Sequence, residues 1–139
     1  MENRDYLKDQ IEQPGKVLAK ALSDFLELKS KGQQSRGIEM TQNRLQTELN
    51  IDIEKLSSSS KDELKNFTNK RQLKARHLEI LSDYLKETGT ATAQTNKTKA
   101  KKYLEKSIEL LDIANEISET ISFERISKKA EAEKALQSL

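Results

Sequence analysis

Apolar residues recur at helical spacing along the stretch from Leu73 to Ile121, and this pattern constrains the fold most. In the first half, steps of three to five residues separate Leu73, Leu78, Leu81, Leu85 and Thr88. In the second half the pattern is almost unbroken and comprises Ala100, Tyr103, Leu104, Ser107, Ile108, Leu111, Ala114, Ile117 and Ile121. Such stripes are typical of amphipathic helices that bury one face. The sequence therefore predicts two helices that pack against each other.

The segment between these two helices is predicted to be a turn. Gly89 follows the first stripe at a position where a left-handed residue often ends a helix. The residues from Thr90 to Thr98 are rich in Thr, Ala, Gln and Asn and carry no sustained apolar period. We therefore expect a helical hairpin over about residues 71–120.

The composition favours an all-α fold. The chain of 139 residues is 34% hydrophobic and 35% charged, with a single proline and four glycines. Val17 is its only valine, whereas strands are usually rich in β-branched residues. We predict one all-helical domain over 1–139, a helical bundle of five to six helices. N-terminal helices should span about 4–69, and a C-terminal helix about 122–138.

The N-terminal helix should carry a heptad-like stripe, which comprises Leu7, Ile11, Pro14, Leu18, Ala21, Phe25 and Leu28. Pro14 lies inside this stripe, where proline removes a backbone hydrogen bond. A kink or break at Pro14 is favoured over simple tolerance of the proline. The segment from Lys29 to Gly37 is predicted to be a loop, followed by a helix whose core contacts are Ile38, Leu45 and Leu49.

Between residues 50 and 70 the pattern changes. Ile51, Ile53 and Leu56 alternate, which predicts an irregular or helical-turn connection with buried anchors. The run Ser57–Ser60 has the composition of a linker, so a break between two small subdomains is an alternative. Ser60 with Glu63 also forms a capping-box pattern, which predicts a short helix with Leu64 and Phe67 facing inward.

After the hairpin, the sequence predicts a tight turn or bend from Glu119 to Ser122. A last helix should then begin with the apolar residues Phe123, Ile126 and Ala130.

Part of the hairpin resembles a known repeat family. The segment from Ala100 to Leu110, AKKYLEKSIEL, is similar to the second helix of a tetratricopeptide repeat, with Ala100 and Ser107 at its small positions and Leu104 at its large apolar position. Leu85 and Gly89 loosely match the first helix. Asp112 stands where the family has proline, the spacing from glycine to alanine is one residue short, and no second copy follows. The resemblance implies stacked helical hairpins.

The whole chain also resembles a family of small bacterial helical proteins of unknown function. This resemblance rests on Asn3–Leu7 and on Ser122–Arg125, and it implies no activity.

Residues suited to catalysis are scarce. The chain has no cysteine and one histidine, His77, and neither Glu79 nor Asp83 lies at the helical spacing that would orient it. No metal-binding or phosphate-binding motif is present. We therefore expect no catalytic residue, no metal site and no cofactor, and we do not expect an enzyme.

Charge and hydropathy also limit the classes of partner. The N-terminus is charged and no long apolar segment is present, so we expect a cytoplasmic protein without membrane contact. Two basic clusters are present, Lys70, Arg71, Lys74 and Arg76, and then Lys97, Lys99, Lys101 and Lys102. They should lie at opposite ends of the hairpin. Because the net charge is only +2, nucleic acid is an unlikely partner, and weak nucleic-acid binding is the alternative function.

Protein binding is the function that these observations favour. Ile80, Tyr84, Leu110 and Ile113 lie beside the main stripes and widen the apolar arcs. They are either core residues covered by the N-terminal helices, or a face for a protein or peptide partner or a second copy of the chain. We predict a non-catalytic adaptor or regulatory module, with these four residues as the candidate partner-binding site.

Overall fold

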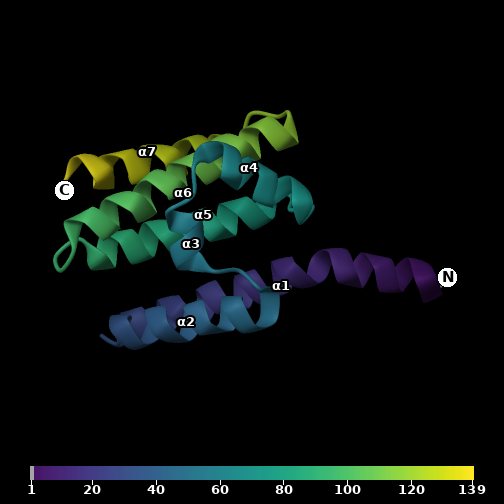
Figure 1. Cartoon of the computed structure of the whole chain (residues 1–139), viewed down its shortest axis with the longest axis horizontal. Helices are drawn as coiled ribbons and strands as arrows, with labels where there is room; N and C mark the ends of the chain where they lie inside the picture. The colour runs from purple at the N-terminus through teal and green to yellow at the C-terminus, as the bar shows by residue number, and fades with distance from the viewer. Residues whose placement is uncertain (1) are drawn as a thin grey trace. The chain divides into compact units, whose positions relative to one another are not determined.

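The computed structural model describes the backbone of residues 2–139 and the side chains from Pro14 onward. The described residues form seven helices and no strand (Figure 1). The helices are α1 (Glu2–Ser30), α2 (Gln34–Leu49), α3 (Ile53–Ser57), α4 (Lys61–Lys70), α5 (Ala75–Thr92), α6 (Lys97–Ser118) and α7 (Phe123–Gln137). The all-α prediction is confirmed. The predicted number of five to six helices was too low, because the short connection before the serine run folds as α3.

The helices divide into two compact units, residues 1–53 and residues 54–139. The division falls at the beginning of α3, a few residues before the serine run that has the composition of a linker. The single domain inferred from chain length stays a prediction.

In the first unit, α1 and α2 form a hairpin. Gly37 lies inside α2 and is buried, so the predicted loop is shorter than expected and the helix begins at Gln34. A Cβ at Gly37 would lie 3.1 Å from Phe25 Cδ2, which shows how closely the two helices approach. The buried stripe of α2 is Gly37, Thr41 and Leu45. Leu45 therefore matches its prediction, whereas Ile38 and Leu49 are only half-buried.

Helix α1 runs through Pro14 without a break, so the predicted break does not occur. Leu18, Ala21 and Phe25 are buried, as the heptad-like stripe predicts. The predictions for Leu7 and Ile11 fall on side chains outside the described residues.

The connection into the second unit follows its prediction. Ile51, Ile53 and Leu56 are all buried. Helix α4 begins with the predicted capping box: the Ser60 hydroxyl accepts from the Glu63 N–H at 3.1 Å, and the Glu63 carboxylate accepts from the Ser60 N–H at 3.0 Å. Leu64 is buried, whereas Phe67 is half-buried beneath the Arg71 guanidinium, which lies 4.9 Å from its ring centre.

Helices α5 and α6 form the predicted antiparallel hairpin (Figure 1). Two buried serines join them. Ser82 Oγ donates to the carbonyl of Ser107, and Ser107 Oγ donates to the carbonyl of Ser82, both at 2.9 Å. Small side chains at these positions let the two backbones approach within hydrogen-bonding distance of a hydroxyl. The predicted first-half stripe is buried along its whole length, from Leu73 to Thr88.

Gly89 does not end α5, contrary to the prediction, since the helix continues to Thr92. It is buried in the hairpin, where a Cβ would lie 3.0 Å from Leu104 Cγ and 3.3 Å from the carbonyl oxygen of Ala100. The glycine therefore serves close packing of two helices. The turn itself spans residues 93–96, and Asn96 caps α6 by accepting from the Lys99 N–H.

The stripe of α6 is buried from Ala100 to Ala114 except for the half-buried Ile108, but its last two members are not. Ile117 is 40% exposed, and Ile121 lies beyond the end of the helix and is 84% exposed. The prediction that Ile117 and Ile121 belong to the packed stripe was therefore wrong. A backbone reversal after Ser118 turns Ile121 away from the helix face that the periodicity assumes.

Candidate functional site

The four residues predicted to bind a partner lie mostly in the core. Tyr84, Leu110 and Ile113 are at most 2% exposed, and Ile80 is half-buried. Their burial favours the alternative in which they are core residues that widen the packed arcs of α5 and α6. An open apolar surface has to be sought elsewhere.

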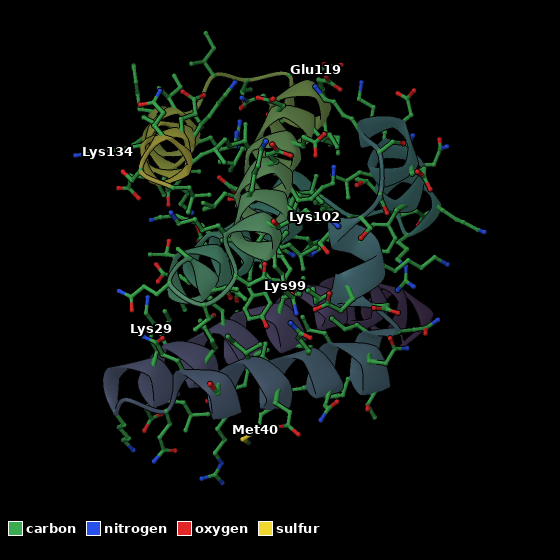
Figure 2. The ribbon with its side chains drawn as sticks, turned by 60° about the vertical axis from the view of Figure 1, so that its left-hand side comes forward. Lys29, Met40, Lys99, Lys102, Glu119 and Lys134 are labelled. Atoms are coloured by element: carbon green, nitrogen blue, oxygen red, sulfur yellow. The ribbon has the colours of Figure 1, made fainter. Side chains whose placement is uncertain are left out.

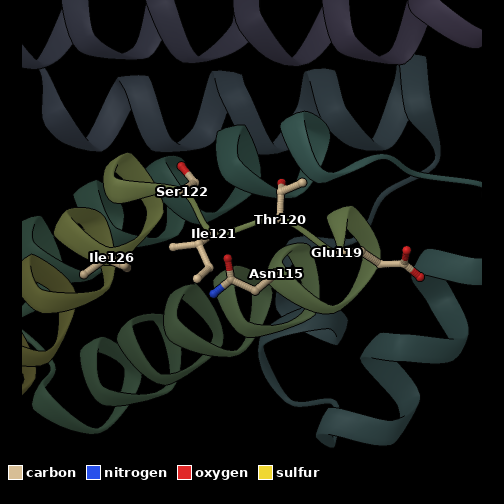
Figure 3. Close-up of a pocket in the computed structure, with 6 residues that line it drawn as sticks. All are labelled: Asn115, Glu119, Thr120, Ile121, Ser122 and Ile126. Carbon is tan, nitrogen blue, oxygen red and sulfur yellow. The ribbon is translucent and has the colours of Figure 1, made fainter.

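The largest exposed apolar side chains of the second unit gather at the turn between α6 and α7. Phe123 is 85% exposed and Ile126 is 52% exposed, and they follow the exposed Ile117 and Ile121 in sequence. An open pocket of about 380 Å³ lies here (Figure 3). Its lining residues are Asn115, Glu119, Thr120, Ile121, Ser122 and Ile126. We call Ile117, Ile121, Phe123 and Ile126 the turn surface.

Local hydrogen bonds hold the backbone of this turn. Glu119 ends α6 in the left-handed conformation, with φ of 56°, and its N–H donates to the Asn115 carbonyl. Ser122 caps α7 by accepting from the Arg125 N–H. Figure 3 shows the side chains of Asn115 and Ile121 directed toward each other and that of Glu119 directed away from them. The predicted bend from Glu119 to Ser122 is therefore confirmed, and it places Ile121 at the surface.

Helix α7 packs on α5 and α6 through a charged side chain. Arg125 is only 6% exposed. Its guanidinium donates to Asn115 Oδ1 at 2.6 Å, to Ser118 Oγ at 2.7 Å and to the Thr120 carbonyl at 3.0 Å. It also lies 3.6 Å from the Glu79 carboxylate of α5. One arginine thus ties the last turn of α6, the reversal and α5 to the first turn of α7.

Further ion pairs continue along the helix. Lys128 pairs with Asp83 at 3.1 Å and Glu131 pairs with Lys86 at 2.7 Å, both on α5, and Lys129 pairs with Asp112 of α6 at 2.8 Å. Burial is the largest single influence and would lower the pKa of Lys128, but the hydrogen bond to Asp83 and the negative charges of Asp83, Glu124 and Glu79 together raise it. The residue numbers of the paired side chains increase in the same direction along α5 and α7, from Asp83–Lys128 to Lys86–Glu131. These two helices therefore run parallel. Figure 1 shows α5, α6 and α7 side by side.

Helix α7 therefore packs with the face opposite to the one that carries Phe123 and Ile126. Ala132 is the only fully buried apolar residue among the described residues of α7, whereas Phe123, Ile126 and Ala130 are exposed. The last helix begins at Phe123, as the sequence predicts, but the acids of α5 and α6 attract its basic face, so these three apolar residues do not pack inward. A signal was available in the sequence. Arg125, Lys128, Lys129 and Ala132 also follow helical spacing, on the opposite face.

His77 is fully buried at the beginning of α5 and has a structural role there. Its Nδ1 accepts a hydrogen bond from the Lys74 N–H at 3.0 Å and so caps the helix. Its Nε2 is buried with no hydrogen-bond partner among the described residues. Burial lowers the pKa of His77, and the positive charges of Arg76 and Lys74 lower it further.

This environment predicts that acidification destabilises the protein. Because the pKa of His77 is lower in the folded state than its ordinary value of about 6.5, the unfolded state binds the proton first as the pH falls. Its contribution to stability is present above about pH 6.5 and is lost as the pH falls through the folded-state pKa. We expect the free energy of unfolding, measured with urea, to fall between pH 7.5 and pH 5.

The control for this prediction is His77→Gln, which keeps a cap acceptor but cannot titrate in that range. Because His77 is the only histidine, the variant should show a much smaller change over the same interval. An equal change in both proteins would rule out His77 as its source.

The two basic clusters lie at opposite ends of the α5–α6 hairpin, as predicted. In Figure 2, Lys99 and Lys102 label the beginning of α6 and Glu119 labels its other end. Lys99 pairs with Glu54 of α3 at 3.0 Å, and Tyr103 donates to the same carboxylate at 2.6 Å. Lys101 lies 4.0 Å from Glu105. Acids of the chain itself therefore neutralise part of the second cluster.

The described residues offer few other features of a site. A pocket of about 50 Å³ beside Phe25 and Met40 in the first unit is smaller than usual small-molecule sites. Among the residues that the structure describes, no three or more His, Asp or Glu side chains are grouped so that they could hold a metal ion. None of the described helices combines the length and the apolar character needed to cross a membrane.

Comparisons of this chain with protein-family models, with curated proteins and with solved structures find no match.

Proposed function

We propose that this protein is a non-catalytic adaptor or regulatory module, and that it binds a protein partner through the turn surface. One observation carries the proposal: α7 exposes its large apolar side chains and packs with its charged face. Exposing Phe123 and Ile126 forgoes the burial of apolar area, which would contribute about 25 cal/mol per Å². Exposed apolar side chains that gather beside a pocket are typical of interaction sites, and Ile121 and Ile126 line this one.

The position of the turn surface supports this proposal. Its residues come from the end of α6, the reversal and the beginning of α7, which the buried Arg125 holds together. A surface with a fixed backbone loses less conformational entropy on binding than a mobile one. A tetratricopeptide-like arrangement of α5 and α6 remains part of the proposal, supported by the contact of Gly89 with Leu104 and Ala100.

The experiment is a comparative affinity capture from a native lysate with quantitative mass spectrometry. The test variant carries Ile121→Ser and Phe123→Ser. The matched control carries Met40→Ser, which also removes an exposed apolar side chain, but on α2. Since all three side chains are mostly exposed, the free energy of unfolding of both variants should lie within about 0.5 kcal/mol of that of the unaltered protein.

We expect at least one protein to be captured by the unaltered chain and by the Met40 control, and to be lost about tenfold or more from the double variant. If all three proteins capture the same set in equal amounts, the turn surface is not the binding site. Capture of nucleic acid alone, removed by salt, would favour the basic clusters instead.

A further inference from the structure

We infer that the partner segment that occupies the turn surface is a basic amphipathic helix. The inference rests on the proposed function and concerns the chemistry of the occupant. Around the turn surface, the basic side chains of α7 face the hairpin, whereas Glu119 and Glu124 are exposed.

The bases of this region point inward. Arg125 is buried beside Glu79, and Lys128 and Lys129 pair with Asp83 and Asp112. Each of these three cations is engaged with an acid of α5 or α6, and Arg125 also donates to the Thr120 carbonyl in the reversal. They contribute little positive charge to the outer surface of the turn.

The acids of the region point outward. Glu119 is one of the residues that line the pocket, and its exposed side chain points away from Asn115 and Ile121 toward solvent (Figure 3). Glu124 is 74% exposed at its side chain, although Lys128 lies 3.4 Å away, whereas Glu116 is ion-paired with Lys65 at 3.3 Å and adds little to the rim. An apolar surface with an acidic rim is complementary to apolar side chains flanked by lysine or arginine.

This charge distribution argues against three other occupants. A second copy bound through the same surface would bring Glu119 and Glu124 close to their own counterparts, because a two-fold interface pairs a patch with itself. Nucleic acid and anionic lipid would meet the same repulsion. The complementary occupant is therefore a cationic protein segment.

The local geometry favours a helical segment. The described residues contain no strand, so no sheet edge is available for an extended peptide to pair with. The pocket of about 380 Å³ lies within the usual size range of ligand pockets and can receive an apolar anchor. Apolar anchors at positions i, i+3, i+4 and i+7 of a helix would meet Ile121 and Ile126, which line the pocket, and the exposed Ile117 and Phe123 of the same turn surface.

The test is a nuclear magnetic resonance titration of the full, isotopically labelled chain with designed peptides of about 14 residues, near the length at which isolated helices begin to form. The first peptide has leucine at helical i, i+3, i+4, i+7 spacing and lysine elsewhere. The second replaces each lysine with glutamate. The third contains the residues of the first in an order without helical periodicity, so it has the same charge and composition.

We expect the lysine peptide to shift the amide signals of residues 115–126 in a saturable manner. The glutamate peptide should bind about tenfold more weakly or less. The scrambled peptide should not saturate, because it has no continuous apolar face. In the protein, Ile121→Ser with Phe123→Ser should abolish the shifts, whereas Met40→Ser should not. Glu119→Gln with Glu124→Gln should weaken binding by about threefold and reduce its dependence on salt.

The outcomes separate this inference from the proposed function. If the glutamate peptide binds residues 115–126 as tightly as the lysine peptide, the inferred charge is wrong and the proposed function stands. If no peptide shifts these residues, or if sedimentation shows self-association through them, the basic helix is excluded as the occupant. The proposed function itself fails only if the comparative capture shows no difference between the double variant and the Met40 control.

Discussion

Replacing Arg125 with alanine is expected to lower the free energy of unfolding of residues 54–139 by about 3–5 kcal/mol. The side chain is 6% exposed and makes hydrogen bonds to Asn115, Ser118 and Thr120. Its removal leaves the half-buried Glu79 carboxylate without its cation and leaves acceptors in the reversal unpaired. Hydrogen exchange during urea unfolding would measure the loss, and α7 should lose its protection first.

The matched control is Arg76→Ala, at an exposed arginine on α5. The free energy of unfolding of this variant should lie within about 0.5 kcal/mol of that of the unaltered protein. Arg125→Lys should restore only part of the stability, since an ammonium cannot reproduce the planar fork of the guanidinium. If Arg125→Ala costs no more than Arg76→Ala, the buried arginine does not hold the turn.

Replacing Leu104 with alanine is expected to cost about 2–5 kcal/mol, the range for a leucine removed from a packed core. Leu104 is completely buried in the hairpin and lies against Gly89. Urea unfolding measures the loss. The same substitution at Leu26, which is 41% exposed, is the control and should cost far less.

A second substitution at Gly89 tests why this contact exists. In an ordinary helix, alanine is more favourable than glycine by about 1 kcal/mol. Here the added Cβ would crowd Leu104 and the Ala100 carbonyl, at an overpacking cost of about 1–3 kcal/mol. We expect this cost to exceed the gain in helix propensity, so Gly89→Ala should be destabilising. In the Leu104→Ala background the crowding is largely relieved. In that background Gly89→Ala should therefore be stabilising. If the two substitutions instead change the free energy of unfolding additively in the double variant, close packing is not the role of Gly89.

The helical content was predictable because it depends on local patterns. The apolar period from Leu73 to Leu111, the scarcity of valine and the capping residues Ser60 and Glu63 each act within one or two turns of chain. The same locality explains the errors. Gly37 was predicted to lie in a loop and Gly89 at a helix end because glycine is common in both places, whereas both serve contacts with residues on another helix.

The candidate site could not be predicted from periodicity. Periodicity left open whether a neighbouring helix covers Tyr84, Leu110 and Ile113. In the structure all three are buried. Phe123 and Ile126 were predicted only to begin the last helix, because apolar spacing does not show which face of a helix its neighbours cover.

The sequence by itself determined that the chain is all-helical, where most helices lie, and which residues form the stripe between α5 and α6. Only the tertiary structure decided which face of α7 packs inward. Two stripes, one apolar and one basic, compete on that helix. The acids Glu79, Asp83 and Asp112 come together only when α5 and α6 pair, and they then select the basic stripe. Because this selection depends on residues distant in sequence, the local pattern contains both stripes but does not show which of them packs.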